Sequence, residues 1–118
     1  MDLFCELKDS HLETIAPGIK RLVFTLDKVM LAYFELSPGA RISKHSHPHE
    51  QAGVIISGRL LWTVGGEKRV LEAPALYRIP SGHDHEVEVM GNEKAIVVDA
   101  FSPIREDFLT QKTPSYME

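Results

Sequence analysis

The sequence predicts an all-β protein, an antiparallel sandwich or barrel that forms a single domain. Short runs in which apolar and polar residues alternate, or in which β-branched residues dominate, follow one another along most of the 118 residues. Most runs are followed by residues that reverse a chain, chiefly Gly, Pro, Ser and Asn. A domain typically needs about 100 to 200 residues, and 43% hydrophobic residues suffice for one core. These observations exclude a second domain and a disordered chain.

We expect about eight strands, each with period-two alternation or β-branched residues. In chain order they cover residues 21–26, 29–37, 51–57, 59–64, 68–71, 75–79, 85–89 and 94–101. The turns between them are Ser37-Pro38-Gly39, Ser57-Gly58, Gly65-Gly66, Pro80-Ser81-Gly82 and Gly91-Asn92. The pair Gly65-Gly66 is the clearest hairpin signal, because glycine accepts the positive φ that a tight hairpin turn requires.

The two ends of the chain carry no strand pattern. We expect residues 1–19 to form an N-terminal arm that packs on the barrel or on a partner, and residues 20–102 to form the barrel itself. Residues 103–118 are expected to form a C-terminal tail, with one or two helical turns over residues 104–109 before Pro114.

Composition and charge exclude several classes of protein. There are 13 basic and 17 acidic side chains, for a net charge of −4, and the basic ones are scattered, so neither nucleic acid nor an anionic membrane is an expected partner. No apolar run approaches the roughly 20 residues that span a bilayer. The start from Met1 to Glu6 lacks the features of a secretory signal, which predicts a cytoplasmic protein. Cys5 is the only cysteine, which excludes an internal disulfide and a site with several thiolate ligands.

Five of the six histidines lie in two short clusters, His45, His47 and His49 and then His83 and His85. Alternate side chains of an extended segment share a face, so His45 and His47 point the same way, with about 6.5 to 7 Å between their Cα atoms. That spacing suits two imidazoles on one ion. In an extended segment Gln51 lies on the same face as His45 and His47, and Glu50 lies on the opposite face. Gln51 is therefore the preferred third ligand, although a bend of the chain at Pro48 weakens this argument.

His85 begins a strand in which Val87 and Val89 share its parity, and this places His85 on the inward face. A histidine there, together with a His-x-His segment entering another strand, is how a β-barrel offers imidazoles to a metal in its mouth. The alternative is that the first cluster forms a solvated loop and that His85 is a hydrogen-bonded histidine at an edge. The spacing by itself leaves both interpretations open.

The longer pattern resembles the cupin family. Residues 39–58 read G-x5-H-x-H-x3-Q-x6-G, and residues 80–85 read P-x-G-x-x-H, which are similar to the first and second cupin motifs. The resemblance covers most of the chain. It implies a single-domain jelly roll, also called a double-stranded β-helix, with one divalent transition metal ion on four ligands, His45, His47, Gln51 and His85. His49 and His83 fall at positions that the pattern does not use, so we expect them at the mouth or the surface.

The sequence departs from the cupin motifs at three positions. Gln51 replaces the usual Glu, Pro74 stands where the second motif usually opens with Gly, and Val89 replaces its closing Asn. Only the first departure concerns the metal. A neutral amide makes the ligand set one charge less negative, which weakens the binding of hard cations and leaves the metal more electrophilic.

The last expected strand leaves the environment of Asp99 open. Ala95, Val97, Asp99 and Phe101 share one face of the strand, and Ile96, Val98 and Ala100 share the other. Both sets are apolar enough to face the core. If the first set is inward, Asp99 is a buried carboxylate and a candidate acid or base. If the second set is inward, Asp99 is solvated.

The segment from Asp99 to Phe108 is similar to the closing segment of the pectin-degradation cupins, which linearise unsaturated uronates. This resemblance implies functional roles for Asp99, Phe101 and Arg105, and it implies the glutamine in the metal site. A guanidinium suits a uronate, because it can bind a carboxylate through two parallel hydrogen bonds. The alternative is that Arg105 is a surface residue paired with an adjacent carboxylate, that of Glu106 or Asp107.

The resemblance predicts a metal-dependent isomerase that converts 4,5-unsaturated monosaccharide uronates, released from pectate or alginate, to the linear keto form. Zinc, nickel, manganese or iron could serve, with Asp99 and Arg105 as catalytic residues and with Arg105 and Phe101 binding the substrate. Two alternatives use the same site: a metal-dependent dioxygenase, and a cupin that binds a sugar or metal without catalysis. Apolar residues on both faces of residues 54–56 predict a homodimer paired through sheet edges.

Overall fold

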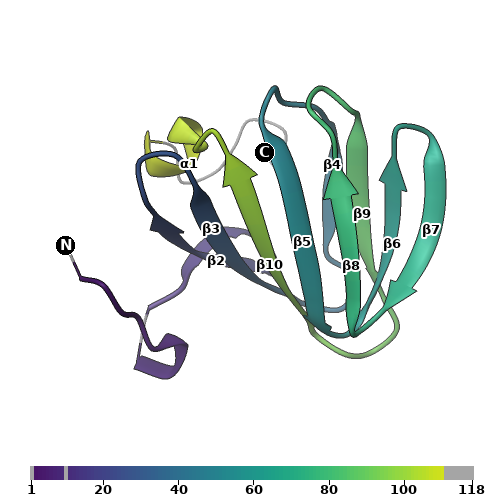
Figure 1. Cartoon of the computed structure of the whole chain (residues 1–118). Helices are drawn as coiled ribbons and strands as arrows, with labels where there is room; N and C mark the ends of the chain where they lie inside the picture. Colours follow the sequence, from purple (N-terminus) through teal and green to yellow (C-terminus); the bar gives the residue numbers. More distant parts are fainter. Residues whose placement is uncertain (1, 10, 111–118) are drawn as a thin grey trace.

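Two antiparallel β-sheets face each other in the computed structural model, which describes residues 2–9 and 11–110 (Figure 1). The six-stranded sheet has the order β1-β2-β3-β10-β5-β8, and the four-stranded sheet has the order β4-β9-β6-β7. The strands are β1 (Glu13–Ala16), β2 (Ile19–Thr25), β3 (Met30–Leu36), β4 (Arg41–His45), β5 (Glu50–Ser57), β6 (Arg59–Val64), β7 (Glu67–Glu72), β8 (Ala75–Ile79), β9 (His85–Met90) and β10 (Ala95–Ser102). A 3-10 turn, η1, covers Leu7–Asp9. The predicted all-β jelly roll is confirmed.

Two strands, β1 and β4, were not among the expected ones. Strand β1 lies inside the range expected to be an N-terminal arm, and it pairs with β2 across a turn in which Gly18 has a φ of 74°. Strand β4 carries one apolar side chain among charged and polar ones, so its sequence has no strand signature. It forms because it pairs with β9, a segment about 45 residues further along the chain.

The core lies between the inner faces of the two sheets. Strands β3, β9 and β10 alternate strictly between buried and less buried residues, as period-two side chains require. In β10 the buried set contains Val97, Asp99 and Phe101, whereas Ile96 and Val98 face outward. Asp99 is therefore inward, which decides between the two alternatives for this strand.

The segment after β10 forms a short helix, α1 (Glu106–Thr110), as expected for the start of the tail. Its Phe108 is buried and packs edge to face on Phe101 and Phe34, with ring centroids 5.4 and 6.5 Å away. The guanidinium of Arg21 lies 4.3 Å from the Phe108 ring, and its Nη2 donates a hydrogen bond of 3.3 Å to the Phe108 carbonyl. These contacts attach α1 to the sheets. The rest of the expected tail, residues 111–118 with Pro114, lies outside the described residues.

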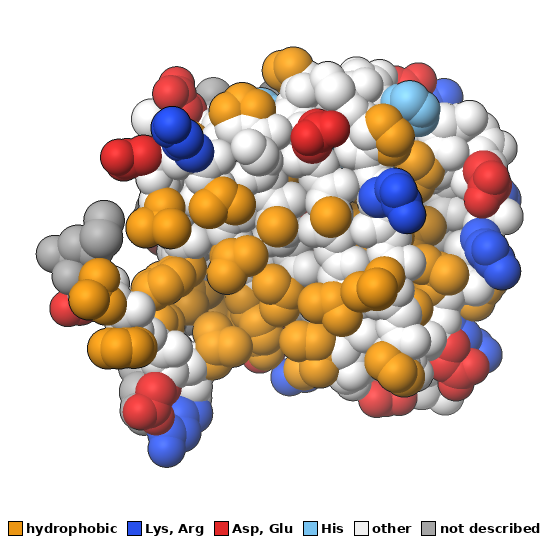
Figure 2. Space-filling view, viewed as in Figure 1, with side chains coloured by type: hydrophobic (Ala, Val, Ile, Leu, Met, Phe, Trp, Pro, Cys, Tyr) orange, Lys and Arg blue, Asp and Glu red, His pale blue; other side chains and the backbone are white. Residues whose placement is uncertain are grey.

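The outer face of the six-stranded sheet is apolar, and Figure 2 shows hydrophobic side chains gathered across it. One row crosses five paired strands and consists of Leu22, Tyr33, Val98, Val54 and Leu76. Leu76 is 78% exposed and Ile56 is 53% exposed. Monomeric proteins rarely expose a continuous apolar surface of this kind.

Within the described residues, no helix has the length and apolar character that crossing a membrane requires.

Candidate metal centre

Three histidines, two on neighbouring strands and one in a loop, converge at one end of the fold. His45 ends β4 and lies opposite His85, which begins β9, and His47 follows in the loop after β4. One ring nitrogen from each of the three can be chosen so that all lie within 4.8 Å of one another. His47 and His85 are 9% and 3% exposed, and His45 is half-buried. The interpretation of the first cluster as a solvated loop is therefore wrong for His47, and the interpretation of His85 as an edge histidine is wrong as well.

Backbone carbonyl groups fix which ring nitrogen each histidine presents. Nδ1 of His45 lies 2.8 Å from the Ser43 oxygen, Nδ1 of His47 lies 3.2 Å from the His49 oxygen, and Nδ1 of His85 lies 2.9 Å from the His83 oxygen. A carbonyl oxygen only accepts hydrogen bonds, so each Nδ1 carries the proton. All three Nε2 atoms consequently keep a lone pair, which is the arrangement that metal-binding histidines adopt.

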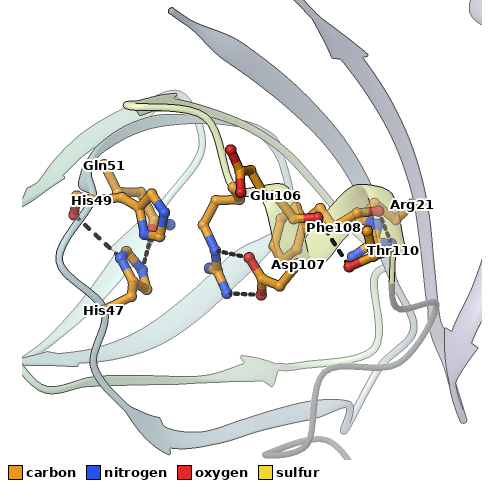
Figure 3. A network of polar contacts seen from close by, with 9 residues as sticks. Arg21, His47, His49, Gln51, Glu106, Asp107, Phe108 and Thr110 are labelled. Carbon is orange, nitrogen blue, oxygen red and sulfur yellow. Dashed lines mark hydrogen bonds and ion pairs between the residues drawn. The ribbon is translucent and has the colours of Figure 1, made fainter.

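Gln51 supplies an oxygen beside these nitrogens. It lies on the inward face of β5, is 7% exposed, and places Oε1 3.1 Å from Nε2 of His47 (Figure 3). The Gln51 side chain also hydrogen-bonds Asp99, and an ionised carboxylate can only accept, so the amide NH2 faces Asp99 and Oε1 faces His47. Two lone pairs then face each other across 3.1 Å, an arrangement that a cation between them stabilises. The donor set fits a metal ion on three nitrogens and one oxygen.

Burial favours the neutral form of the three converging histidines. Burial lowers the pKa of His45 and of His47 to about 4, and the nearby charge of Arg105 contributes to both shifts. Burial lowers the pKa of His85 in the same way. Metal binding requires the unprotonated imidazole. The lowered pKa values therefore favour the form of the imidazole that binds a metal.

Asp99 lies next to this cluster and is held by Tyr77. The register aligns Tyr77 on β8, Gly53 on β5 and Asp99 on β10, and the Tyr77 hydroxyl donates a hydrogen bond across the glycine to Oδ1 of Asp99. A Cβ atom at Gly53 would overlap both the Tyr77 ring and the Asp99 carboxylate, so this contact requires glycine. Neither Tyr77 nor Gly53 is among the residues predicted for the site. The available signals were a glycine inside a strand and the parity that Tyr77 shares with the buried Ile79.

The proton affinity of Asp99 is raised by its surroundings. Burial raises the pKa of Asp99 to about 6, although hydrogen bonds from Tyr77 and Gln51 act to lower it. Asp99 is 5% exposed, which agrees with burial as the main cause. A carboxyl group with this pKa can both accept and release a proton near neutral pH.

Arg105 is buried and held by a carboxylate. Its Nε donates to Oδ1 of Asp107 over 3.1 Å and its Nη2 donates to Oδ2 over 2.7 Å, and Figure 3 shows Asp107 in this paired arrangement. The guanidinium lies 4.1 Å from the Phe108 ring centroid and 5.4 Å from that of Phe101. The expected alternative, a surface arginine paired with Glu106 or Asp107, is right about the Asp107 partner but wrong about the surface, since Arg105 is 4% exposed.

A cavity of about 30 Å³ joins the predicted site residues. Its lining includes His45, Gln51, His85, Asp99, Phe101 and Arg105. His47 completes the group, with its ring centroid 4.9 Å from that of His85 and 5.9 Å from that of Phe101. The structure thus brings together all seven residues that the sequence analysis singled out for metal, substrate and catalysis.

The two remaining histidines of the clusters contribute through their backbone. His83 is exposed and His49 is half-buried, in agreement with the expected mouth or surface positions. Their carbonyl oxygens accept the hydrogen bonds from His85 and His47. Through these carbonyl groups they fix the orientation of the His85 and His47 imidazoles.

Comparison with known proteins agrees with this architecture. The pectin degradation protein KdgF of Dickeya dadantii (strain 3937) is 33% identical over 99 residues, which are 82% of this chain and 89% of that protein. The structure of KdgF from Halomonas sp. superposes with a TM-score of 0.85 at 25% identity, covering 92% of this chain and 99% of that one. An RmlC-like cupin from Shewanella frigidimarina NCIMB 400 superposes with a TM-score of 0.85 at 28% identity, covering 92% and 96%. The family model described as Cupin domain matches residues 32–101, and the chain belongs to the cupin family.

Proposed function

We propose that this protein is a metal-dependent isomerase that converts 4,5-unsaturated monosaccharide uronates, released by pectate or alginate breakdown, to the linear keto form. The observation that carries this proposal is the single cavity that joins a set of neutral metal ligands, a buried carboxyl group with a pKa of about 6 and a buried guanidinium. Similarity to a pectin degradation protein supports the substrate class. We also propose that the protein acts in the cytoplasm.

The proposed reaction moves protons and leaves the oxidation state unchanged. The anomeric hydroxyl loses its proton, the bond between the anomeric carbon and the ring oxygen breaks, and the alkene carbon C4 gains a proton as the enol becomes a ketone. Asp99 is a group in the cavity that can carry these protons, because its pKa of about 6 leaves both of its forms populated near neutral pH. Tyr77 orients its carboxylate through the hydrogen bond across Gly53.

The other residues bind the substrate and hold the metal. Arg105 binds the uronate carboxylate, and Phe101 forms the adjoining wall of the cavity. His45, His47, Gln51 and His85 would hold zinc, nickel, manganese or iron. Such an ion, when bound, acts as a Lewis acid towards substrate oxygens.

The direct test follows the ultraviolet absorbance of unsaturated monouronates prepared with a lyase. We expect the purified protein to accelerate the loss of this absorbance, a chelator to abolish the acceleration, and added divalent metal to restore it. A rate equal to that of buffer, with metal supplied, contradicts the isomerase. Oxygen uptake with phenolic substrates would instead support the dioxygenase, and tight sugar binding without turnover would support the binding protein.

We propose that the protein is a homodimer that buries the outer face of the six-stranded sheet. The continuous apolar row on this face favours the face over the sheet edges that the sequence suggested. Val54→Glu introduces a charge within the row and is expected to yield a monomer in size-exclusion chromatography with light scattering. Val70→Glu, at a half-exposed position of β7 in the other sheet, is the matched control and is expected to stay dimeric. A monomeric wild-type protein contradicts this proposal.

A further inference from the structure

The cavity beside the metal ligands is much smaller than the substrate it is proposed to bind. Its volume is about 30 Å³, which accommodates about one water molecule. Pockets for small organic ligands usually measure roughly 300 to 1,000 Å³. A monosaccharide therefore enters only if part of the cavity wall moves.

Arg105 lines this cavity, and its partner Asp107, which is not itself a lining residue, is the side chain of the pair that is suited to move. The side chain of Arg105 is 4% exposed and that of Asp107 is 32% exposed, so one partner is fixed inside and the other borders solvent. The guanidinium of Arg105 lies against the rings of Phe101 and Phe108, whereas Asp107 reaches it from the first turn of the five-residue helix α1. Figure 3 shows Asp107 extending from α1 towards the side of the site that contains His47 and Gln51.

We propose that the Asp107 carboxylate competes with ligands for Nε and Nη2 of Arg105, which form the carboxylate-binding edge of the guanidinium. A ligand binds this edge only when a carboxylate of its own displaces Asp107. This makes Asp107 a specificity-determining residue for carboxylate-bearing sugars. The inference rests on the proposed function only in taking the ligand to be a uronate.

The charges explain why the exchange selects carboxylates. Burial alone would raise the pKa of Asp107, but hydrogen bonds and the charge of Arg105 outweigh it and lower the pKa, so Asp107 is ionised at neutral pH. When an incoming carboxylate takes the place of Asp107, the buried guanidinium keeps an anionic partner. The Asp107 side chain then rotates into the solvent. A neutral sugar offers no such replacement, and removing one partner of a buried ion pair is strongly unfavourable.

The exchange does not require α1 to detach. Phe108 stays buried against Phe34 and Phe101, and Arg21 holds its carbonyl. Rotation of the Asp107 side chain into solvent is therefore sufficient to open the carboxylate-binding edge.

The test is isothermal titration of the metal-loaded full chain with D-galacturonate, a saturated uronate that cannot undergo the isomerisation, and with neutral D-galactose. Asp107→Asn removes the competing charge, and we expect it to bind galacturonate about ten-fold more tightly than wild type, with little change for galactose. Glu106→Gln makes the same charge change at the neighbouring exposed position and is expected to behave like wild type. Asp107→Glu keeps a carboxylate and should bind galacturonate about as weakly as wild type does.

Unchanged or weaker galacturonate binding by folded Asp107→Asn overturns the proposal, and so does an equal gain for galactose, which would indicate only a wider cavity. If Asp107→Asn does not fold, Asp107→Ser, which has no carboxylate to pair with Arg105, is judged by the same criterion. Tighter galacturonate binding by the variant, together with a wild type that does not turn over unsaturated uronates, would reject the isomerase and leave the competition intact.

Discussion

Asp99→Asn is expected to lower the turnover of unsaturated uronates by about 100- to 10,000-fold, the usual loss when a general acid or base is removed. Asparagine has nearly the same shape as aspartate and still accepts the hydrogen bond from Tyr77, so the cavity keeps its form. It cannot accept and release a proton near pH 7. Because Gln51 keeps its place beside His47, the metal content should stay at the wild-type level.

The same variant is expected to be more stable than wild type at neutral pH. The folded protein raises the pKa of Asp99 from 3.8 to about 6, so it binds this proton more tightly than the unfolded chain does. Protonated Asp99 therefore contributes favourably to the free energy of unfolding below about pH 4. This contribution, on the order of 3 kcal/mol for a shift of this size, is lost as the pH rises through about 6. Asparagine stays neutral and avoids this loss.

Thermal unfolding of both proteins between pH 4 and pH 8 measures the effect. The advantage of Asp99→Asn should grow as the pH rises from about 4 to about 7. Asp27→Asn makes the same chemical change in an exposed turn and should alter neither turnover nor stability. A variant that retains wild-type turnover would exclude Asp99 from the proton transfers.

His47→Ala is expected to remove the metal and, with it, the activity. The substitution deletes one imidazole ligand and leaves Oε1 of Gln51 without its neighbouring nitrogen. Loss of even an outer hydrogen-bond partner of a metal ligand costs roughly 10- to 100-fold in affinity or activity, and loss of a ligand costs at least as much. We expect wild type to contain one metal ion per chain by plasma mass spectrometry and His47→Ala to contain far less. Its turnover should fall to that of chelator-treated wild type.

His83→Ala provides the matched control for this result. It removes an exposed imidazole from the second cluster but keeps the carbonyl group that orients His85. Metal content and turnover should match those of wild type. The ligand assignment is wrong if His47→Ala keeps a full equivalent of metal, or if His83→Ala loses its metal to the same extent.

Much of the candidate metal centre could be predicted from local spacing. His45, His47 and Gln51 lie within seven residues of one another, and His85 begins a strand whose apolar parity is unambiguous. Period-two alternation depends only on neighbouring residues, so it is readable in the chain. Strand β4 escaped detection because its side chains are mostly polar, and pairing with β9 makes it a strand.

The orientation of Asp99 could not be read in this way. Both faces of β10 are apolar, since one faces the core and the other belongs to the apolar outer surface of the six-stranded sheet. Periodicity identifies an inner face only where the two faces differ in polarity. The position of β10 between β3 and β5, which lie far apart in the sequence, decides the matter.

By itself, the sequence determined the all-β class, the turns and the candidate metal ligands, because composition and alternation are properties of short segments. Tertiary structure alone decided that the Tyr77 hydroxyl reaches Asp99 across Gly53. It also decided that Asp107 accepts hydrogen bonds from the guanidinium of a buried Arg105. The first contact depends on the register of three strands. The second depends on the burial that α1 and the rings of Phe101 and Phe108 impose. Register and burial arise from contacts between distant segments, which local patterns do not encode.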